Sequence, residues 1–128
     1  MKTAMTHLRE ALEAVWKPDT AYLQVEEKGN PALGQCYPTS RVVQLFFPEL
    51  EIVEGQVWTG KSMEKHFWNV LIVNGEEYHI DFTWQQFSLG SSVKSYKIRN
   101  RETLGDGEET MKRVDLLHSR VKEYLASK

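Results

Sequence analysis

Hydrophobic residues recur with two different periods along this chain, and these periods predict helices near both ends and strands between them. In residues 3–16 apolar side chains recur every three or four positions until Pro18 ends the pattern, which is typical of an amphipathic helix. Residues 36–47 are apolar on most sides, with Pro38 in the first turn and Pro48 directly after the segment. Because proline is tolerated in the first turn of a helix and ends a helix that it follows, we expect a second, mostly buried helix here.

The C-terminal residues predict a third helix. The Gly-Asp-Gly segment at 105–107 breaks the preceding pattern, and Asp106 with Glu109 three residues later has the form of a helix cap. The apolar residues at helical spacing after this break are Met111, Val114, Leu117, Val121 and Tyr124 or Leu125. We therefore expect a helix that is capped by Asp106 and packs along one face.

Strand signals fill the middle of the chain. Residues 51–58 predict one strand, and residues 93–98 predict another at an edge of the sheet. Residues 66–73 and 76–83 are two β-rich runs joined by Asn74-Gly75, the dipeptide that type I′ hairpin turns prefer. We therefore expect a hairpin within a small antiparallel sheet.

This order of elements predicts a single α+β domain over residues 1–128, in which N-terminal helices, one of them starting at Cys36, pack on the sheet and a C-terminal helix follows. With 16 Lys+Arg and 18 Asp+Glu the net charge is -2, so we expect neither nucleic acid nor an anionic membrane as a partner. No apolar run is long enough for a signal peptide or a membrane span, and one cysteine cannot form an intrachain disulfide. These features indicate a cytoplasmic protein.

The hairpin turn predicts which strand residues face each other. A two-residue turn at 74–75 places Trp68 opposite Asp81. In the same register His66 lies opposite Thr83, so His66 and Asp81 are diagonal neighbours, about 7–8 Å apart at the backbone, on the less apolar face. The other face is expected to pack on the core and carries Phe67, Leu71, Val73, Tyr78, Ile80 and Phe82.

Three residues in this arrangement have the chemistry of a nucleophilic site. An imidazole that donates one N–H to a carboxylate presents a basic second nitrogen, so His66 with Asp81 fits a general base. Cys36 starts a helix, where the helix dipole and free amide N–H groups favour a thiolate and can bind an oxyanion. We predict a catalytic triad of Cys36, His66 and Asp81. The Gln35 amide is expected to support it as an oxyanion donor, and Trp68 as a wall beside the imidazole.

Each of these residues also has a simpler interpretation. A lone cysteine can be a small buried hydrophobe, and His66 with Asp81 can be an ion pair that only stabilises the hairpin. The segment His79-Ile80-Asp81, with His118 as a third ligand, has the form of a metal-binding facial triad. That site normally lies inside a double-stranded barrel, which this chain is too short to build, so we expect no metal and no other cofactor.

Two segments and the spacing between them resemble a known family. They are GQCYPTSRVVQ and HFWNVLIVNGEEYHIDFTWQQF, and they are similar to the YunG-like family of small bacterial proteins. The matching positions are Gly34, Gln35, Cys36, Thr39, His66, Phe67, Trp68, Asn69, Asp81, Phe82, Thr83, Gln86 and Phe87. A cysteine at the start of a helix, followed by His and Asp on strands, also resembles the papain-like and transglutaminase-like cysteine fold.

The resemblance implies a fold and a Cys-His-Asp site more directly than a substrate. In papain-type peptidases the oxyanion glutamine lies six positions before the cysteine; here that position holds Asn30, and the nearby glutamine is Gln35. We expect a thiol hydrolase or an acyl or amide transferase that acts on a peptide, a protein or a small amide such as a glutamine side chain. The alternative is a catalytically inactive domain of this fold that binds a peptide or a partner protein.

Overall fold

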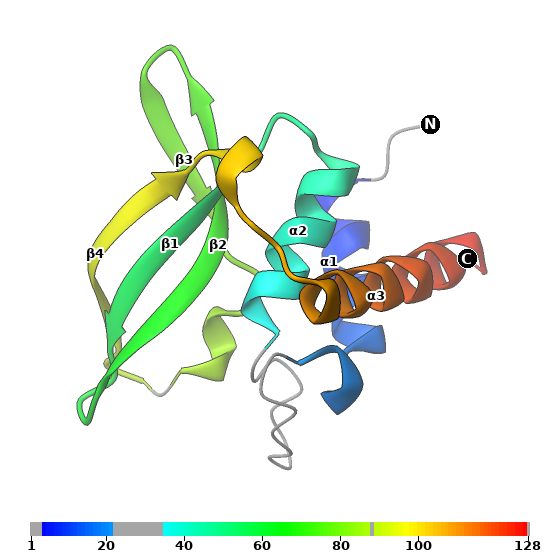
Figure 1. Ribbon diagram of the computed structural model, residues 1–128, viewed down its shortest axis with the longest axis horizontal. Coiled ribbons are helices and arrows are strands. Elements are labelled where there is room, and N and C mark those ends of the chain that lie inside the picture. The colour runs from blue at the N-terminus through cyan, green and yellow to red at the C-terminus, as the bar shows by residue number, and fades with distance from the viewer. Residues whose placement is uncertain (1–3, 22–34, 88, 128) are drawn as a thin grey trace.

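The elements of the protein follow the predicted order (Figure 1). The structure is a computed structural model, and it describes residues 4–21, 35–87 and 89–127. The helices are α1 (Met5–Val15), α2 (Cys36–Phe46) and α3 (Glu108–Ala126). The strands are β1 (Glu51–Trp58), β2 (Met63–Val73), β3 (Glu76–Ile80) and β4 (Ser92–Arg99), and short 3-10 turns lie at Pro18–Thr20 (η1), Trp84–Gln86 (η2) and Arg101–Thr103 (η3). The predicted α+β class is confirmed. Two residues named in the sequence analysis, Asn30 and Gly34, lie outside the described residues.

The four strands form one curled antiparallel sheet in the order β3-β2-β1-β4 (Figure 1). β4 is an edge strand, as predicted. The hairpin turn between β2 and β3 has positive φ at both central residues, 52° at Asn74 and 81° at Gly75, as a type I′ turn requires. The register between the two strands is the one predicted from this turn.

β3 ends earlier than predicted. Its last residue is Ile80, so the ladder does not include the predicted partners of His66 and Trp68. Asp81 turns the chain here, because its Oδ1 accepts hydrogen bonds from the backbone N–H of Thr83 at 3.0 Å and from the Thr83 hydroxyl at 3.3 Å. An aspartate bonded to the backbone two residues later favours a turn over a continuing strand, and this turn leads into η2.

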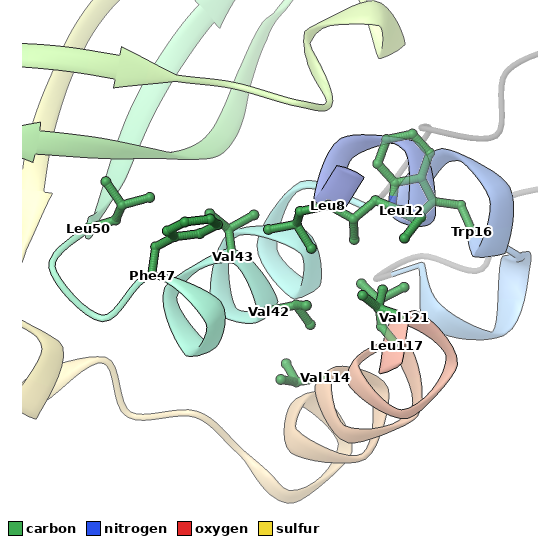
Figure 2. Packing of buried hydrophobic residues seen from close by; sticks show 11 residues of the cluster. Leu8, Leu12, Trp16, Val42, Val43, Phe47, Leu50, Val114, Leu117 and Val121 are labelled. Atoms are coloured by element: carbon green, nitrogen blue, oxygen red, sulfur yellow. The ribbon is translucent and has the colours of Figure 1, made fainter. Parts of the chain in front are cut away.

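The main hydrophobic core forms around α2, which lies between the sheet and the other two helices (Figure 1). Figure 2 shows Val114, Leu117 and Val121 of α3 turned toward the apolar side chains of α1 and α2. The buried members of this core are Leu8, Ala11, Leu12, Trp16, Val42, Val43, Phe47, Leu50, Val114, Leu117 and Val121. The apolar stripes predicted for the three helices therefore meet in one place.

One face of the hairpin packs on this core, as predicted, but only over part of its length. Leu71, Ile80 and Phe82 contact the core. Val73 and Tyr78 lie near the hairpin turn and are 43 % and 50 % exposed. The prediction that these two side chains pack on the core is wrong, because the end of the hairpin extends past the helices (Figure 1).

The hairpin face that carries His66 forms a second buried cluster. Val53, Trp68 and Val70 make up this cluster, and Ile98 packs against it. His66 is completely buried on the same face. The sequence predicts this face as the less apolar one of the hairpin. β1 places Val53 opposite Trp68 of β2, and β4, on the other side of β1, places Ile98 opposite Val53.

α3 begins without the predicted aspartate cap. Its N-cap residue is Gly107, and no side chain caps the helix. The Asp106 carboxylate instead accepts hydrogen bonds from the Tyr37 hydroxyl and from Arg41 Nε, the latter at 2.8 Å. The bond to Arg41 is charge-assisted and therefore among the stronger hydrogen bonds of a protein, and through it Asp106 joins the segment before α3 to α2.

Candidate active site

His66 in β2 and Asp81 after β3 form a hydrogen-bonded pair. His66 Nε2 donates to Asp81 Oδ2 at 2.6 Å, and the His66 side chain is completely buried while that of Asp81 keeps 19 % exposure. Because Thr83 holds the other carboxylate oxygen, Asp81 is fixed in one orientation. The contact predicted between His66 and Asp81 is therefore confirmed. With Nε2 bonded to the carboxylate, Nδ1 is the ring nitrogen left for other chemistry.

Aromatic rings and one amide surround the imidazole of His66. Its ring centroid lies 4.8 Å from that of Phe87, 5.4 Å from that of Trp68 and 5.9 Å from that of Trp84. Gln86 Nε2 lies 3.2 Å from Nδ1 of the imidazole. Trp84, Gln86 and Phe87 all belong to η2 or follow it directly, so this short turn closes around the histidine.

Cys36 is the first residue of α2, is partly exposed, and lies close enough to His66 to change its ionisation. Burial lowers the pKa of His66, but hydrogen bonds with Asp81 and Cys36, together with the charges of these two residues, outweigh burial and raise this pKa to about 9. His66 is therefore protonated at neutral pH. The charged imidazole is held against the Asp81 carboxylate through Nε2.

Gln35 precedes Cys36, is buried, and directs its amide toward η1. Its Oε1 accepts a hydrogen bond from the Thr20 hydroxyl at 2.7 Å, and its Nε2 donates to the Lys17 carbonyl oxygen at 2.8 Å. These two bonds tie the start of α2 to the segment that follows α1. Gln35 thereby supports the position of Cys36 through the backbone, and its role as an oxyanion donor stays a prediction.

Trp68 is held beside His66 by its partners on both neighbouring strands. Trp68 Nε1 donates to His79 Nδ1 at 2.8 Å, and His79 Nε2 donates to Glu77 Oε1 at 3.0 Å. A Cβ at Gly55 would lie 2.3 Å from Cη2 and 2.5 Å from Cζ3 of the indole, which is too close for any side chain. The missing side chain at Gly55 therefore makes room for the indole next to the imidazole.

Within residues 4–21, 35–87 and 89–127, no group of three or more His, Cys, Asp or Glu side chains is arranged to hold a metal ion. The three residues of the possible facial triad have other partners. His79 bonds to Trp68 and Glu77, Asp81 bonds to His66, and His118 packs on Phe46 with ring centroids 5.4 Å apart. No helix in these ranges is both long and apolar enough to cross a membrane.

Thr83 and Gln86 match the family pattern, but the sequence predicts no role for either of them in the site. Thr83 fixes the carboxylate, and Gln86 contacts the imidazole. The Asp-x-Thr spacing could have indicated the turn, because aspartate often bonds to a backbone N–H two residues later. No sequence pattern pointed to the contact of Gln86 with His66, since it depends on how η2 folds back over the strand.

The fold and this site define an α+β protein in which a buried His–Asp pair lies next to a cysteine that starts a helix. The chain belongs to the YunG protein family, which matches residues 4–126. No curated protein and no solved structure matches it. The predicted family is therefore confirmed, and its placement within the papain-like fold stays a prediction.

Proposed function

We propose that this protein is a cysteine-nucleophile hydrolase or acyl transferase that acts on the carbonyl carbon of an amide in a peptide, a protein or a small molecule. The observation that carries the proposal is the environment of His66: a buried imidazole with one nitrogen bonded to Asp81 and with a pKa that Asp81 and Cys36 together raise. A histidine held in this way keeps a neighbouring thiol deprotonated and returns a proton to a leaving group.

The proposed reaction uses each of the three residues in turn. The thiolate of Cys36 attacks the carbonyl carbon, a C–S bond forms, and the carbonyl π electrons move onto oxygen. When this oxyanion collapses, the C–N bond breaks and the amine leaves with the proton from His66, which gives a thioester on Cys36. Water or a second amine then attacks the thioester, His66 takes the proton from it, and the C–S bond breaks. Asp81 holds the ring and stabilises its charged form throughout.

The position of Cys36 on α2 supports this chemistry. The first helical hydrogen bond runs from Thr39 N to Gln35 O at 3.0 Å, so the backbone N–H groups of Cys36 and Tyr37 precede the hydrogen-bond ladder of the helix. These groups and the helix dipole favour negative charge on the sulfur and on a bound carbonyl oxygen. Cys36 is partly exposed while His66 is completely buried, so a substrate reaches the site from the side of the sulfur.

Alkylation of the single cysteine tests the proposal. An ordinary thiol with a pKa near 8.5 is only about 0.3 % thiolate at pH 6. We expect iodoacetamide to modify Cys36 at pH 6 at least about tenfold faster than it modifies a free cysteine, because His66 favours the thiolate. We expect His66→Ala to remove most of this advantage and Asp81→Asn to remove part of it, as measured by mass spectrometry over time.

His7→Ala is the matched control, because His7 is exposed on α1 and should leave the rate unchanged. A wild-type rate equal to that of a free cysteine, with no change in the His66→Ala variant, would contradict the proposal. That outcome would favour the other function considered for this fold, a domain that binds a peptide or a partner protein without catalysis.

A further inference from the structure

We propose that His79 and Glu77 are positioning residues for the reaction of Cys36. They hold the indole of Trp68 against the imidazole of His66, through a chain of hydrogen bonds that starts at the indole N–H. This assignment rests on the proposed function, and it adds to that function two residues that act through another side chain.

The indole of Trp68 leans along the sheet toward His66. In the ladder between β1 and β2, Trp68 lies opposite Val53, and His66 lies opposite Gly55. A Cβ at Gly55 would lie 2.3 Å from Cη2 of the indole, so the ring extends over this glycine. There its centroid lies 5.4 Å from that of the imidazole, with 30° between the two ring planes. Two aromatic rings at this distance and tilt are offset-stacked, so the indole turns a face to the imidazole.

An indole in this position favours the charged form of His66. The π system attracts a cation that lies against its face, and the attraction is stronger where water is excluded. His66 is completely buried and Trp68 is 5 % exposed, so water screens this contact little. The titratable groups that act on His66 directly are Asp81 and Cys36. The residues of β1, η2 and the end of η2 that face the imidazole carry no charge, and they are Gly55, Trp84, Gln86 and Phe87.

Hydrogen bonds from both edges of the sheet set the orientation of the indole. Trp68 Nε1 donates to His79 Nδ1 at 2.8 Å, and His79 Nε2 donates to Glu77 Oε1 at 3.0 Å. The Tyr96 hydroxyl donates to the same Glu77 oxygen at 2.7 Å, although β3 and β4 are the two edge strands of the curled sheet. The indole has a single polar atom, and because a hydrogen bond requires a defined direction, the bond to His79 orients the ring.

Substitutions of His79, followed by NMR titration of the His66 imidazole, test this assignment. His79→Leu removes the acceptor of the indole N–H, whereas His79→Asn places an amide oxygen close to the position of Nδ1. We expect His79→Leu to lower the midpoint of the His66 titration by about one pH unit, in line with the loss of a cation–π contact at a buried site. The iodoacetamide rate of Cys36 at pH 6 should fall about two- to tenfold, since less thiolate is then paired with an imidazolium. His79→Asn should restore most of both values.

Three further variants complete the test. Tyr78→Phe removes a hydrogen bond at the exposed end of the same strand, so it is the matched control and should change neither value. In a Trp68→Phe background, His79→Leu should have little further effect, because His79 acts through the indole. Glu77→Leu breaks the chain one bond further from the indole and should lower the midpoint by less. It gives the same test if His79→Leu does not fold.

The possible failures are read from different measurements. An unchanged or raised midpoint in His79→Leu would overturn the assignment, and a raised midpoint would indicate that His79 acts on His66 by its own charge. An equal shift in His79→Asn, or a full shift in the Trp68→Phe background, would overturn it as well. An ordinary iodoacetamide rate in the wild-type protein would instead overturn the proposed function, whatever the midpoint of the His66 titration.

Discussion

At the scale of single residues, the site depends on the positive charge of the buried His66 imidazole. His66 has no exposed surface, and burial alone would favour its neutral form. The carboxylate of Asp81 at 2.6 Å and the sulfur of Cys36 reverse this preference and raise the pKa of His66 to about 9. The charged imidazole therefore contributes to stability as well as to the proposed chemistry, because the folded state binds this proton more tightly than the unfolded chain does.

This linkage predicts a loss of stability at alkaline pH. The contribution of His66 is fully present below its unfolded pKa of 6.5 and is lost as the pH rises through about 9. The difference between these two pKa values corresponds to on the order of 3 kcal/mol in the free energy of unfolding. Urea unfolding at pH 6.5 and at pH 9 should show this decrease in the wild-type protein. In Asp81→Asn the free energy of unfolding should change less between these two pH values. An equally steep decrease in that variant would show that groups other than His66 cause the loss of stability.

At the scale of elements, α2 is positioned by polar side chains from elements on all sides of it. Trp16 at the end of α1 donates from Nε1 to the Thr39 hydroxyl at 2.9 Å. Asn69 of β2 donates from Nδ2 to the Ser40 carbonyl oxygen at 3.0 Å, and the segment before α3 contributes Asp106. Because polar bonds require defined angles and distances, they fix the rotation of α2, and with it the direction of the Cys36 side chain, more closely than apolar packing alone does.

Removal of the Asp106 carboxylate should therefore destabilise the protein through α2. Asp106→Ala leaves the half-buried hydroxyl of Tyr37 and the guanidinium of Arg41 without their shared acceptor, which should lower the free energy of unfolding by about 1–3 kcal/mol. Asp115→Ala is the control. Because Asp115 is exposed on α3, this substitution should change the free energy of unfolding by no more than about 0.5 kcal/mol. Urea unfolding at neutral pH measures both, and equal effects of the two substitutions would contradict the link to α2.

At the scale of the whole molecule, the sheet carries buried residues on both of its faces. One face packs on the helical core, and the other forms the cluster of Val53, Trp68 and Val70 beside His66. This second cluster holds the indole of Trp68 at 5.4 Å from the imidazole, between ring centroids. The environment of the histidine therefore depends on side chains from β1, β2 and β4, and so on the complete sheet.

Gly55→Ala tests this dependence. The added methyl group would overlap the indole of Trp68, so we expect a loss of about 1–3 kcal/mol in the free energy of unfolding and a displaced tryptophan, visible as a change in its fluorescence. Trp68→Phe removes the ring atoms that the methyl group would meet. In a double-mutant cycle, Gly55→Ala should therefore cost clearly less in the Trp68→Phe background than in the wild type. If the effects of the two substitutions are additive, the alanine is strained by a contact other than the one with Trp68.

Much of the fold could be predicted because its signals are local. The three helices follow from apolar periodicity and proline positions, and the register of the hairpin follows from Asn74-Gly75 alone. Two of the predictions that failed depended on how distant elements pack. Asp106 bonds to Tyr37 and Arg41 and does not cap α3. Val73 and Tyr78 point to the predicted face of the hairpin, but they lie where no helix covers that face.

The sequence by itself determined the elements, the hairpin register and the approach of His66 to Asp81, since all of these depend on contacts between residues close together in the chain. The tertiary structure decided how the groups around that pair are brought to it. Cys36 comes from a helix packed on the sheet, Trp68 is buried by strands on either side, and Gln86 arrives on a turn that folds back over β2. These contacts arise only when separate elements pack together, because packing brings side chains from distant parts of the chain within hydrogen-bonding distance.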